Sequence, residues 1–206
     1  MKTARFLGLA GPLLLDLFLT GCTTKMAFVK PHSLGSPLVA DRFRTPVELR
    51  LTDSFRNAQW EMHYMGKTVL PFGPHLVTNT VESTHAAFAN LRVTESEVAA
   101  SMSSGARALL IPRLIYVDLS GDLRKDPITM ALEWTMLDST RRLVWVGSFR
   151  SAIRTPAERV KGAKKQVQRR FDLVLEDLLK QSREAMLSSP EIRRFAKSIA
   201  ASEAEK

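Results

Sequence analysis

The sequence of 206 residues contains a single cysteine, Cys22. One thiol cannot form a disulfide within the chain, so the fold must depend on packing even in an oxidising compartment. The sequence also contains no internal repeat and no low-complexity stretch. Its length is sufficient for one domain with a hydrophobic core and some appended segments.

Residue groupings that carry chemistry are missing as well. There is no G-x-S-x-G motif, the glycines are isolated rather than arranged in a phosphate-binding loop, and the acidic residues are scattered. The histidines lack the spacing of metal ligands, because the closest pair is ten residues apart rather than four. The four are His32, His63, His75 and His85. We therefore expect no catalytic residue, no metal site and no cofactor, in a protein that is not an enzyme.

The N-terminal apolar stretch, Phe6 to Leu19, is too short for a transmembrane helix, which needs about 20 apolar residues. Pro12 and Asp16 also interrupt it, and an acidic side chain is costly in lipid. Basic residues precede the stretch, and small residues lie just before Cys22, which is typical of a removable export signal. A buried core helix is the structural alternative for this stretch.

The residues from Leu19 to Cys22 read Leu-Thr-Gly-Cys and resemble the lipobox of bacterial lipoproteins. The resemblance implies that the Cys22 thiol receives a diacylglycerol and that residues 1–21 are then removed. An anchor of more than one acyl chain holds a protein on the membrane effectively permanently. Thr23 stands where the family's inner-membrane proteins have aspartate, so the resemblance implies an outer-membrane anchor with the polypeptide facing the periplasm.

The chain is expected to have four segments. Residues 1–21 are the signal peptide, and residues 22–45, with their proline, serine and glycine, are the lipidated N-terminus and a flexible tether. Residues 46–155 are the core domain, and residues 156–206 are C-terminal helices.

Hydrophobic periodicity predicts an α+β fold with a mostly antiparallel sheet, helices packed on one face and a C-terminal helical extension. Period-two alternation or continuous apolar character predicts strands at 47–51, 60–64, 108–119, 128–136 and 143–149. Helical spacing and capping residues predict helices at 77–91, 94–105, 156–189 and 192–199. Trp134 and Phe171 are expected to be buried between the sheet and the long helix.

The formal net charge is +9, and it is concentrated in the last third of the chain. Six basic residues gather at the start of the long predicted helix, namely Arg159, Lys161, Lys164, Lys165, Arg169 and Arg170. Most of them are expected on one side of the helix, away from Val167 and Phe171. Crowded like charges repel, so an anionic partner would relieve a cost. A solvated helix face is the alternative.

The stretch from Val93 to Ala152 resembles small envelope lipoproteins related to the TolB amino-terminal domain, with which the curli-secretion and Pel polysaccharide-export lipoproteins belong. The resemblance rests on the strand opening at 105–111, on Asp138 and on the return strand Leu-Val-Trp at 143–145. Arg141 or Arg142 stands where that group has glycine. The resemblance implies a non-catalytic assembly, export or scaffolding role, often in rings.

Together these features predict a lipid-anchored periplasmic protein that serves an envelope assembly or export system as an accessory or scaffold. Its partners would be the membrane and other envelope proteins, with self-association left open. The alternative is a binder of an anionic envelope polymer or lipid, such as peptidoglycan, lipopolysaccharide or phospholipid headgroups, through the basic helix 159–170. A periplasmic enzyme without recognisable motifs is the third hypothesis. Nucleic acid is not an expected partner in the periplasm.

Overall fold

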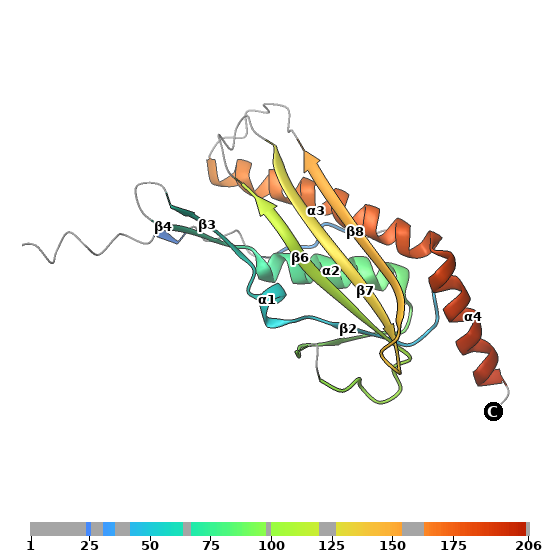
Figure 1. Cartoon of the computed structure of the whole chain (residues 1–206). Helices are drawn as coiled ribbons and strands as arrows, with labels where there is room; N and C mark the ends of the chain where they lie inside the picture. Colours follow the sequence, from blue (N-terminus) through green and yellow to red (C-terminus); the bar gives the residue numbers. More distant parts are fainter. Residues whose placement is uncertain are drawn as a thin grey trace, which may run out of the picture.

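The computed structural model describes residues 24–25, 31–35, 42–63, 67–97, 100–119, 127–153 and 163–204. Its main element is a five-stranded sheet with the strand order β5-β2-β6-β7-β8 (Figure 1). The strands are β2 (Val47–Arg50), β5 (Leu91–Thr94), β6 (Ala108–Asp118), β7 (Ile128–Asp138) and β8 (Leu143–Ile153). β2 is parallel to β5 and β6, whereas β6, β7 and β8 are antiparallel neighbours.

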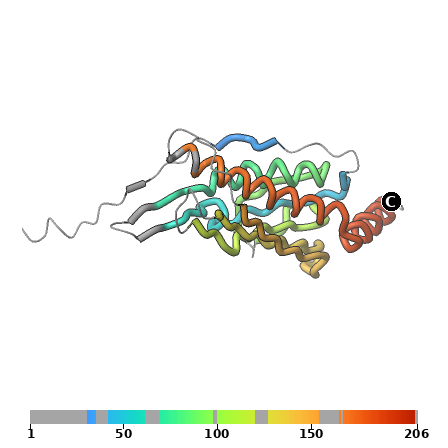
Figure 2. The backbone as a smooth tube through the Cα atoms, turned by 90° about the horizontal axis from the view of Figure 1, so that it is seen from above, coloured from blue at the N-terminus to red at the C-terminus, as the bar shows by residue number. Residues whose placement is uncertain are grey.

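Two helices cover one face of this sheet, α2 (Gly73–Ala87) and α3 (Ala163–Ser188) (Figure 2). α4 (Pro190–Ala204) continues past the end of the sheet. A short α1 (Asp53–Arg56) and a small second sheet complete the fold. The small sheet has the order β1-β4-β3, formed by Thr24–Lys25, Lys67–Pro71 and Gln59–His63. The predicted α+β class and C-terminal helical extension are therefore confirmed, with a mixed main sheet.

No helix in the described part of the chain combines the length and the apolar character that crossing a bilayer requires.

The alternation in β7 places its apolar residues beneath α3. Trp134 is only 1% exposed, and Phe171 on α3 is fully buried, as the sequence predicted. The Trp134 indole N–H donates to the Ser182 hydroxyl at 3.0 Å, and that hydroxyl donates to the Leu178 carbonyl at 2.8 Å. The polar atom of the largest core side chain is thus satisfied inside the sheet–helix interface.

The predicted helix at 94–105 is wrong over the residues described there. Thr94 ends strand β5, and residues 95–97 and 100–106 are not helical. The Thr94 hydroxyl donates to the Glu48 carboxylate at 2.9 Å instead of capping a helix. Pairing of β5 with β2 therefore overrides a local capping signal.

Helical spacing predicts that Val77 and Val81 lie on the buried face of this helix, and the structure corrects that prediction. Val77 and Val81 are only half-buried, whereas Leu76, Thr80 and Ser83 are buried. The small, polar side chains allow α2 to approach α3, and the Ser83 hydroxyl donates to a carbonyl of α3 at 3.3 Å. An apolar spacing pattern cannot detect a helix face of this kind.

The expected start of the long helix at 155–156 lies outside the described residues. α3 ends at Ser188 and Pro190 begins α4, so the predicted break between the two helices is confirmed. Ser189 caps α4, because its hydroxyl accepts the Ile192 N–H at 3.2 Å.

Parts of the expected tether contact the domain. β1 pairs with β4, and the Leu34 N–H donates to the Asn79 side chain at 2.8 Å. Phe43 exchanges backbone hydrogen bonds with residues 87 and 89 at 2.9 and 2.8 Å. At these described positions the chain is packed against the domain rather than free.

The turn between β7 and β8 explains an oddity of the sequence. Arg141 has φ 65°, in the left-handed region that favours glycine. Arg141 rather than Arg142 therefore has the backbone conformation that glycine adopts most readily. The Asp138 carboxylate holds the turn by accepting the N–H groups of Thr140 and Arg142 at 2.8 and 2.9 Å.

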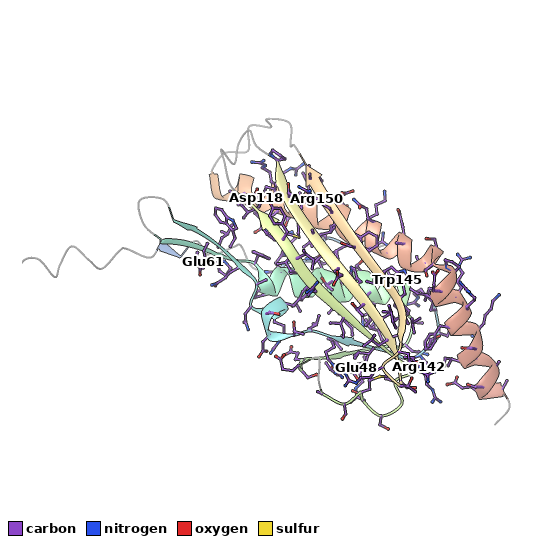
Figure 3. The ribbon with its side chains drawn as sticks, viewed as in Figure 1. Glu48, Glu61, Asp118, Arg142, Trp145 and Arg150 are labelled. Atoms are coloured by element: carbon purple, nitrogen blue, oxygen red, sulfur yellow. The ribbon has the colours of Figure 1, made fainter. Side chains whose placement is uncertain are left out.

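A buried ion pair lies on the sheet face opposite the helices (Figure 3). Glu48 and Arg50 are each 1% exposed and are bonded to one another. Arg50 also donates to the carbonyls of Ala100 and Ser101 at 2.6 and 2.9 Å, and Glu48 accepts the Ser103 N–H. The pair thus fastens the loop after β5 over the sheet. Because Glu48 and Arg50 alternate with the apolar Val47 and Leu49, the strand pattern predicts both on the solvent-exposed face.

Burial acts to raise the pKa of Glu48, but the hydrogen bonds from the Ser103 amide, Arg50 and Thr94 outweigh it and hold the pKa below its ordinary value. A lowered pKa means that the ionised carboxylate contributes stability above the ordinary pKa. That contribution is lost as the pH falls through the lowered, folded-state pKa.

Replacing Trp134 by alanine is expected to lower the free energy of unfolding by about 3 to 5 kcal/mol, because it empties a large buried volume. This is a large share of the total stability of a domain, so the variant should accumulate poorly. Ser182→Ala is the comparison, since it keeps the indole in place and leaves only its N–H without a partner, at a cost of about 1 to 3 kcal/mol. Thermal melting of both variants checks this, and a Trp134→Ala protein that melts within a degree or two of wild type would place the indole on the surface.

Glu48→Gln is expected to lower the melting temperature strongly near neutral pH, because it leaves Arg50 buried without its counter-charge, at a cost of about 3 to 5 kcal/mol. The difference in melting temperature between the variant and wild type should narrow as the pH falls through the lowered pKa of Glu48. Melting curves across an acid series measure it. Glu95→Gln, which breaks an exposed pair with Arg56, is the control and should change little. A gap that stays constant with pH would contradict this account.

Candidate functional site

The structure covers only part of the basic cluster that the sequence singled out. Arg159 and Lys161, and the side chain of Lys164, lie outside the described residues, as does Cys22. Lys165 and Arg169 are exposed on α3.

Arg170 is a correction to the expected basic face, because its side chain is only 5% exposed. It lies three residues after Val167 and four before Val174, which are both buried, so it belongs to the flank of the buried stripe. The exposed cations described at the start of α3 are therefore Lys165 and Arg169.

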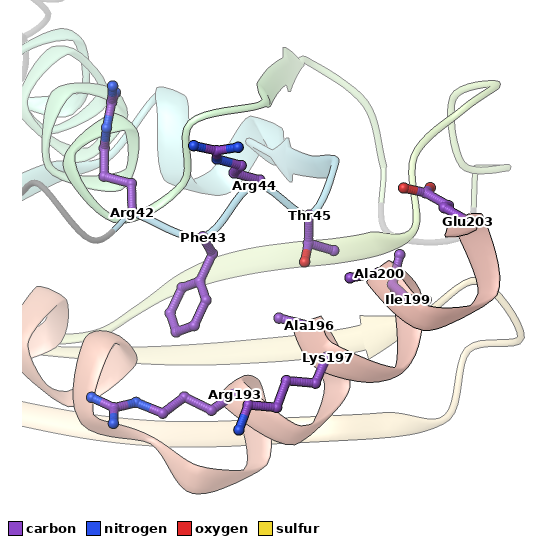
Figure 4. Close-up of a pocket in the computed structure, with 10 residues that line it drawn as sticks. All are labelled: Arg42, Phe43, Arg44, Thr45, Arg193, Ala196, Lys197, Ile199, Ala200 and Glu203. Atoms are coloured by element: carbon purple, nitrogen blue, oxygen red, sulfur yellow. The ribbon is translucent and has the colours of Figure 1, made fainter. Parts of the chain in front are cut away.

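A different surface combines cations with an apolar floor. A groove of about 470 Å³ lies between the segment 42–45 and α4 (Figure 4). This volume is within the range of about 300 to 1,000 Å³ that is usual for small-ligand sites. The groove is lined by Arg42, Phe43, Arg44, Thr45, Arg193, Ala196, Lys197, Ile199, Ala200 and Glu203.

Phe43 forms one side of the apolar floor. Its backbone is held by residues 87 and 89, and its ring packs on Phe88 with the centroids 5.5 Å apart. Because the segment is extended, successive side chains point to opposite sides. Phe43 therefore points toward α4, whereas Arg42 and Arg44 extend from the other side of the segment (Figure 4).

α4 supplies the opposite wall. Ala196, Ile199 and Ala200 present small and aliphatic side chains to the groove, at spacings that share one helix face. Lys197 lies beside them on the rim (Figure 4). A lysine can lay its aliphatic stem on such a floor while its ammonium stays in water.

The lining carries four basic side chains and one acidic one. The acid, Glu203, is already paired with Arg107 at 3.3 Å. Arg193 donates twice to the Leu187 carbonyl, at 3.1 and 2.8 Å. Arg44 and Lys197 form no ion pair with any residue that the structure describes. Two lining cations, Lys197 on α4 and Arg44 on the outer side of segment 42–45, are therefore not committed to an ion pair within the described residues.

This arrangement is suited to binding. Cations above an apolar floor complement a ligand that has an anionic head and an apolar portion. Sequence reasoning missed the site because its two walls are about 150 residues apart in the chain. The only signals were Arg42 and Arg44 flanking an aromatic residue and the four-residue spacing of Arg193 and Lys197, and each is common on solvated surfaces.

No family model matches the sequence, and neither does any curated protein. Solved structures resemble the fold. Protein XCC0632 from Xanthomonas campestris, of the family model DUF330, has a TM-score of 0.52 at 13% identity, over 80% of this chain and 95% of that one. A PelC dodecamer from Paraburkholderia phytofirmans has a TM-score of 0.39 at 14% identity, over 70% and 94%. Lipoprotein GNA1162 from Neisseria meningitidis has a TM-score of 0.34 at 10% identity, over 67% and 97%. At these identities, the first similarity establishes a shared fold and no shared function.

Proposed function

We propose that this chain is a lipid-anchored envelope protein that acts by binding, and that the groove beside α4 receives an anionic lipid. The observation that carries the proposal is the apolar floor of Phe43, Ala196 and Ile199 beside Lys197, with Arg44 bordering the groove from the outer side of its segment. The Leu-Thr-Gly-Cys motif at Cys22 supports a covalent lipid anchor. The binding role keeps the anionic ligand inferred from the sequence and moves its site from the start of α3 to α4.

The chemistry of the groove favours a lipid over a polar polymer. Peptidoglycan offers carboxylates without acyl chains, so it would leave the apolar floor exposed to water, and burial of apolar area is worth about 25 cal/mol per Å². Phospholipids and lipopolysaccharide share a phosphate joined to an acyl region. We propose that the phosphate lies at Lys197, with Arg44 adding positive charge at the edge of the groove and the adjoining acyl carbons on the floor.

The anchor would keep the domain at the membrane that supplies such a ligand. Thr23 after Cys22 supports outer-membrane attachment with the domain in the periplasm. Segment 42–45 begins 20 residues after Cys22, a distance of at most about 70 Å for a fully extended chain, which the pairing of β1 with β4 shortens. The anchored domain therefore stays within reach of the membrane surface.

A second candidate is a scaffold role in an envelope assembly, through other envelope proteins or self-association. The sheet face opposite the helices favours it, because Tyr116, Leu143 and Val146 are 43%, 63% and 53% exposed there. At one end of this face Arg150 lies 5.9 Å above the Tyr116 ring, and the Tyr116 hydroxyl donates to Asp118 at 2.9 Å (Figure 3). An exposed apolar area with a polar rim is typical of a protein interaction surface.

The groove is tested with acylated protein in detergent, mixed with phosphatidylglycerol or with phosphatidylcholine of the same acyl chains. Native mass spectrometry counts the bound lipids. We expect preference for phosphatidylglycerol, weakening as salt rises because exposed charges are screened. The double variant Arg44→Glu, Lys197→Glu should lose at least about tenfold in affinity, which corresponds to about 1.4 kcal/mol. Ala200→Trp should also weaken binding, because it fills the floor without changing the charge.

The matched control is Lys165→Glu, Arg169→Glu, which makes the same change of charge on α3. It should bind as wild type does. Equal loss in this control would return the site to the basic helix, and equal affinity for the two lipids would refute an anionic ligand.

Cys22→Ala is expected to remain unprocessed or to leave the membrane, because it removes the acylation site. Fractionation of cell envelopes with immunoblotting measures this. If the variant is still processed and still found in the outer-membrane fraction, the lipid anchor is wrong, whatever the groove binds.

A further inference from the structure

Three potential metal ligands meet between the N-terminal segment and two helices. His32 belongs to residues 31–35, His75 to the first turn of α2, and Asp172 to α3. One ligand atom from each lies within 4.8 Å of the others. We infer that these residues form a binding site for a divalent transition-metal ion, for which Zn²⁺ is the best fit. The sequence predicted no metal site, because the three residues are far apart in the chain.

The distances agree with ligands that share one ion. Tetrahedral Zn²⁺ with bonds of about 2.0 to 2.1 Å places neighbouring ligand atoms about 3.3 Å apart. Asp172 Oδ1 lies 2.9 Å from His75 Nε2, and the other oxygen of the same carboxylate, Oδ2, lies 3.4 Å from His32 Nε2. The two imidazole centroids are 4.8 Å apart.

The direction of His75 Nε2 is the second observation. This atom is buried and makes no hydrogen bond, although the carboxylate oxygen is only 2.9 Å away. The ring nitrogen therefore points past the carboxylate rather than along the line to its oxygen. Two ligands of one ion are oriented in this way, because each points at the ion and not at the other ligand. A buried imidazole nitrogen without a hydrogen bond is also costly unless something else satisfies it.

Outer contacts hold the ligands in place. The Asn79 side-chain amide donates to the carbonyls of His32 and His75, at 3.1 and 2.9 Å. The Gln168 amide donates to the Asp172 carboxylate at 2.7 Å. Such contacts orient ligands and raise metal affinity in known sites.

Burial leaves one side of the site accessible. The side chains of His75, Asp172 and His32 are 2%, 18% and 45% exposed. The ion therefore has an entry path and room for a water as fourth ligand. Two imidazoles and one carboxylate favour Zn²⁺ and its neighbours over Mg²⁺ or Ca²⁺, which prefer oxygen ligands. Bound there, the ion would fasten the segment after the lipid anchor to α2 and α3.

The test uses the acylated protein in detergent, stripped with a chelator and titrated with Co²⁺ and with Zn²⁺. We expect one equivalent of Co²⁺ to give the visible absorption of a low-coordinate site, and Zn²⁺ to displace it. The melting temperature should rise by roughly 5 to 10 °C at a hundredfold excess of Zn²⁺ over its Kd.

His32→Ala and Asp172→Asn should each weaken Zn²⁺ binding at least tenfold. Neither change empties the core, because His32 is half-exposed and asparagine keeps the shape of Asp172. His85→Ala, an exposed histidine of the same helix as His75, is the matched control and should bind as wild type does.

Two results would overturn the proposal. Absence of stoichiometric binding means that the three side chains make only a histidine–carboxylate pairing. Binding that persists in both the His32→Ala and Asp172→Asn proteins means that the ion is held elsewhere. The readouts involve no lipid, so the outcome is independent of the groove.

Discussion

The packing of α3 across β7 and β8 determines where every other feature lies. Its stripe of Phe171, Val174 and Leu178 is buried, and Ser182 holds the indole of Trp134 beneath it. Asp172 lies on the flank of the same helix, next to His32 and His75. Its C-terminal end leads into α4, which forms one wall of the groove. A change in how α3 lies on the sheet would therefore move both candidate sites together.

The fold was predictable where burial and local pattern agree. β7 has one face under α3, so its period of two is visible in the sequence and correctly placed Trp134. The pattern misled where tertiary contacts compete with it. Thr94 has a capping signal but pairs in a sheet, and α2 buries Thr80 and Ser83 because a close helix neighbour needs small side chains there. Alternation also predicted that Glu48 and Arg50 are exposed to solvent. The loop that covers them has no recognisable sequence pattern, so their burial could not be predicted.

The candidate sites were less predictable than the fold, because each unites segments that are distant in the chain. The charge count directed attention to the last third of the chain, where Arg193 and Lys197 lie. It could not show that α4 faces Phe43, a contact that depends on the break at Pro190. For the histidines, local spacing is informative only when one helix or turn supplies the ligands, whereas here His32, His75 and Asp172 come from three separate elements.

The width of the groove depends on the junction between α3 and α4 more than on the groove's own side chains. Ser189 caps α4, and the Arg193 guanidinium reaches back to donate twice to the Leu187 carbonyl. These bonds fix the direction in which α4 leaves α3. Arg193 is thus committed to positioning the helix, although it borders the groove. Recognition of an anion therefore falls to Lys197 on α4, with Arg44 adding charge at the edge of the other wall.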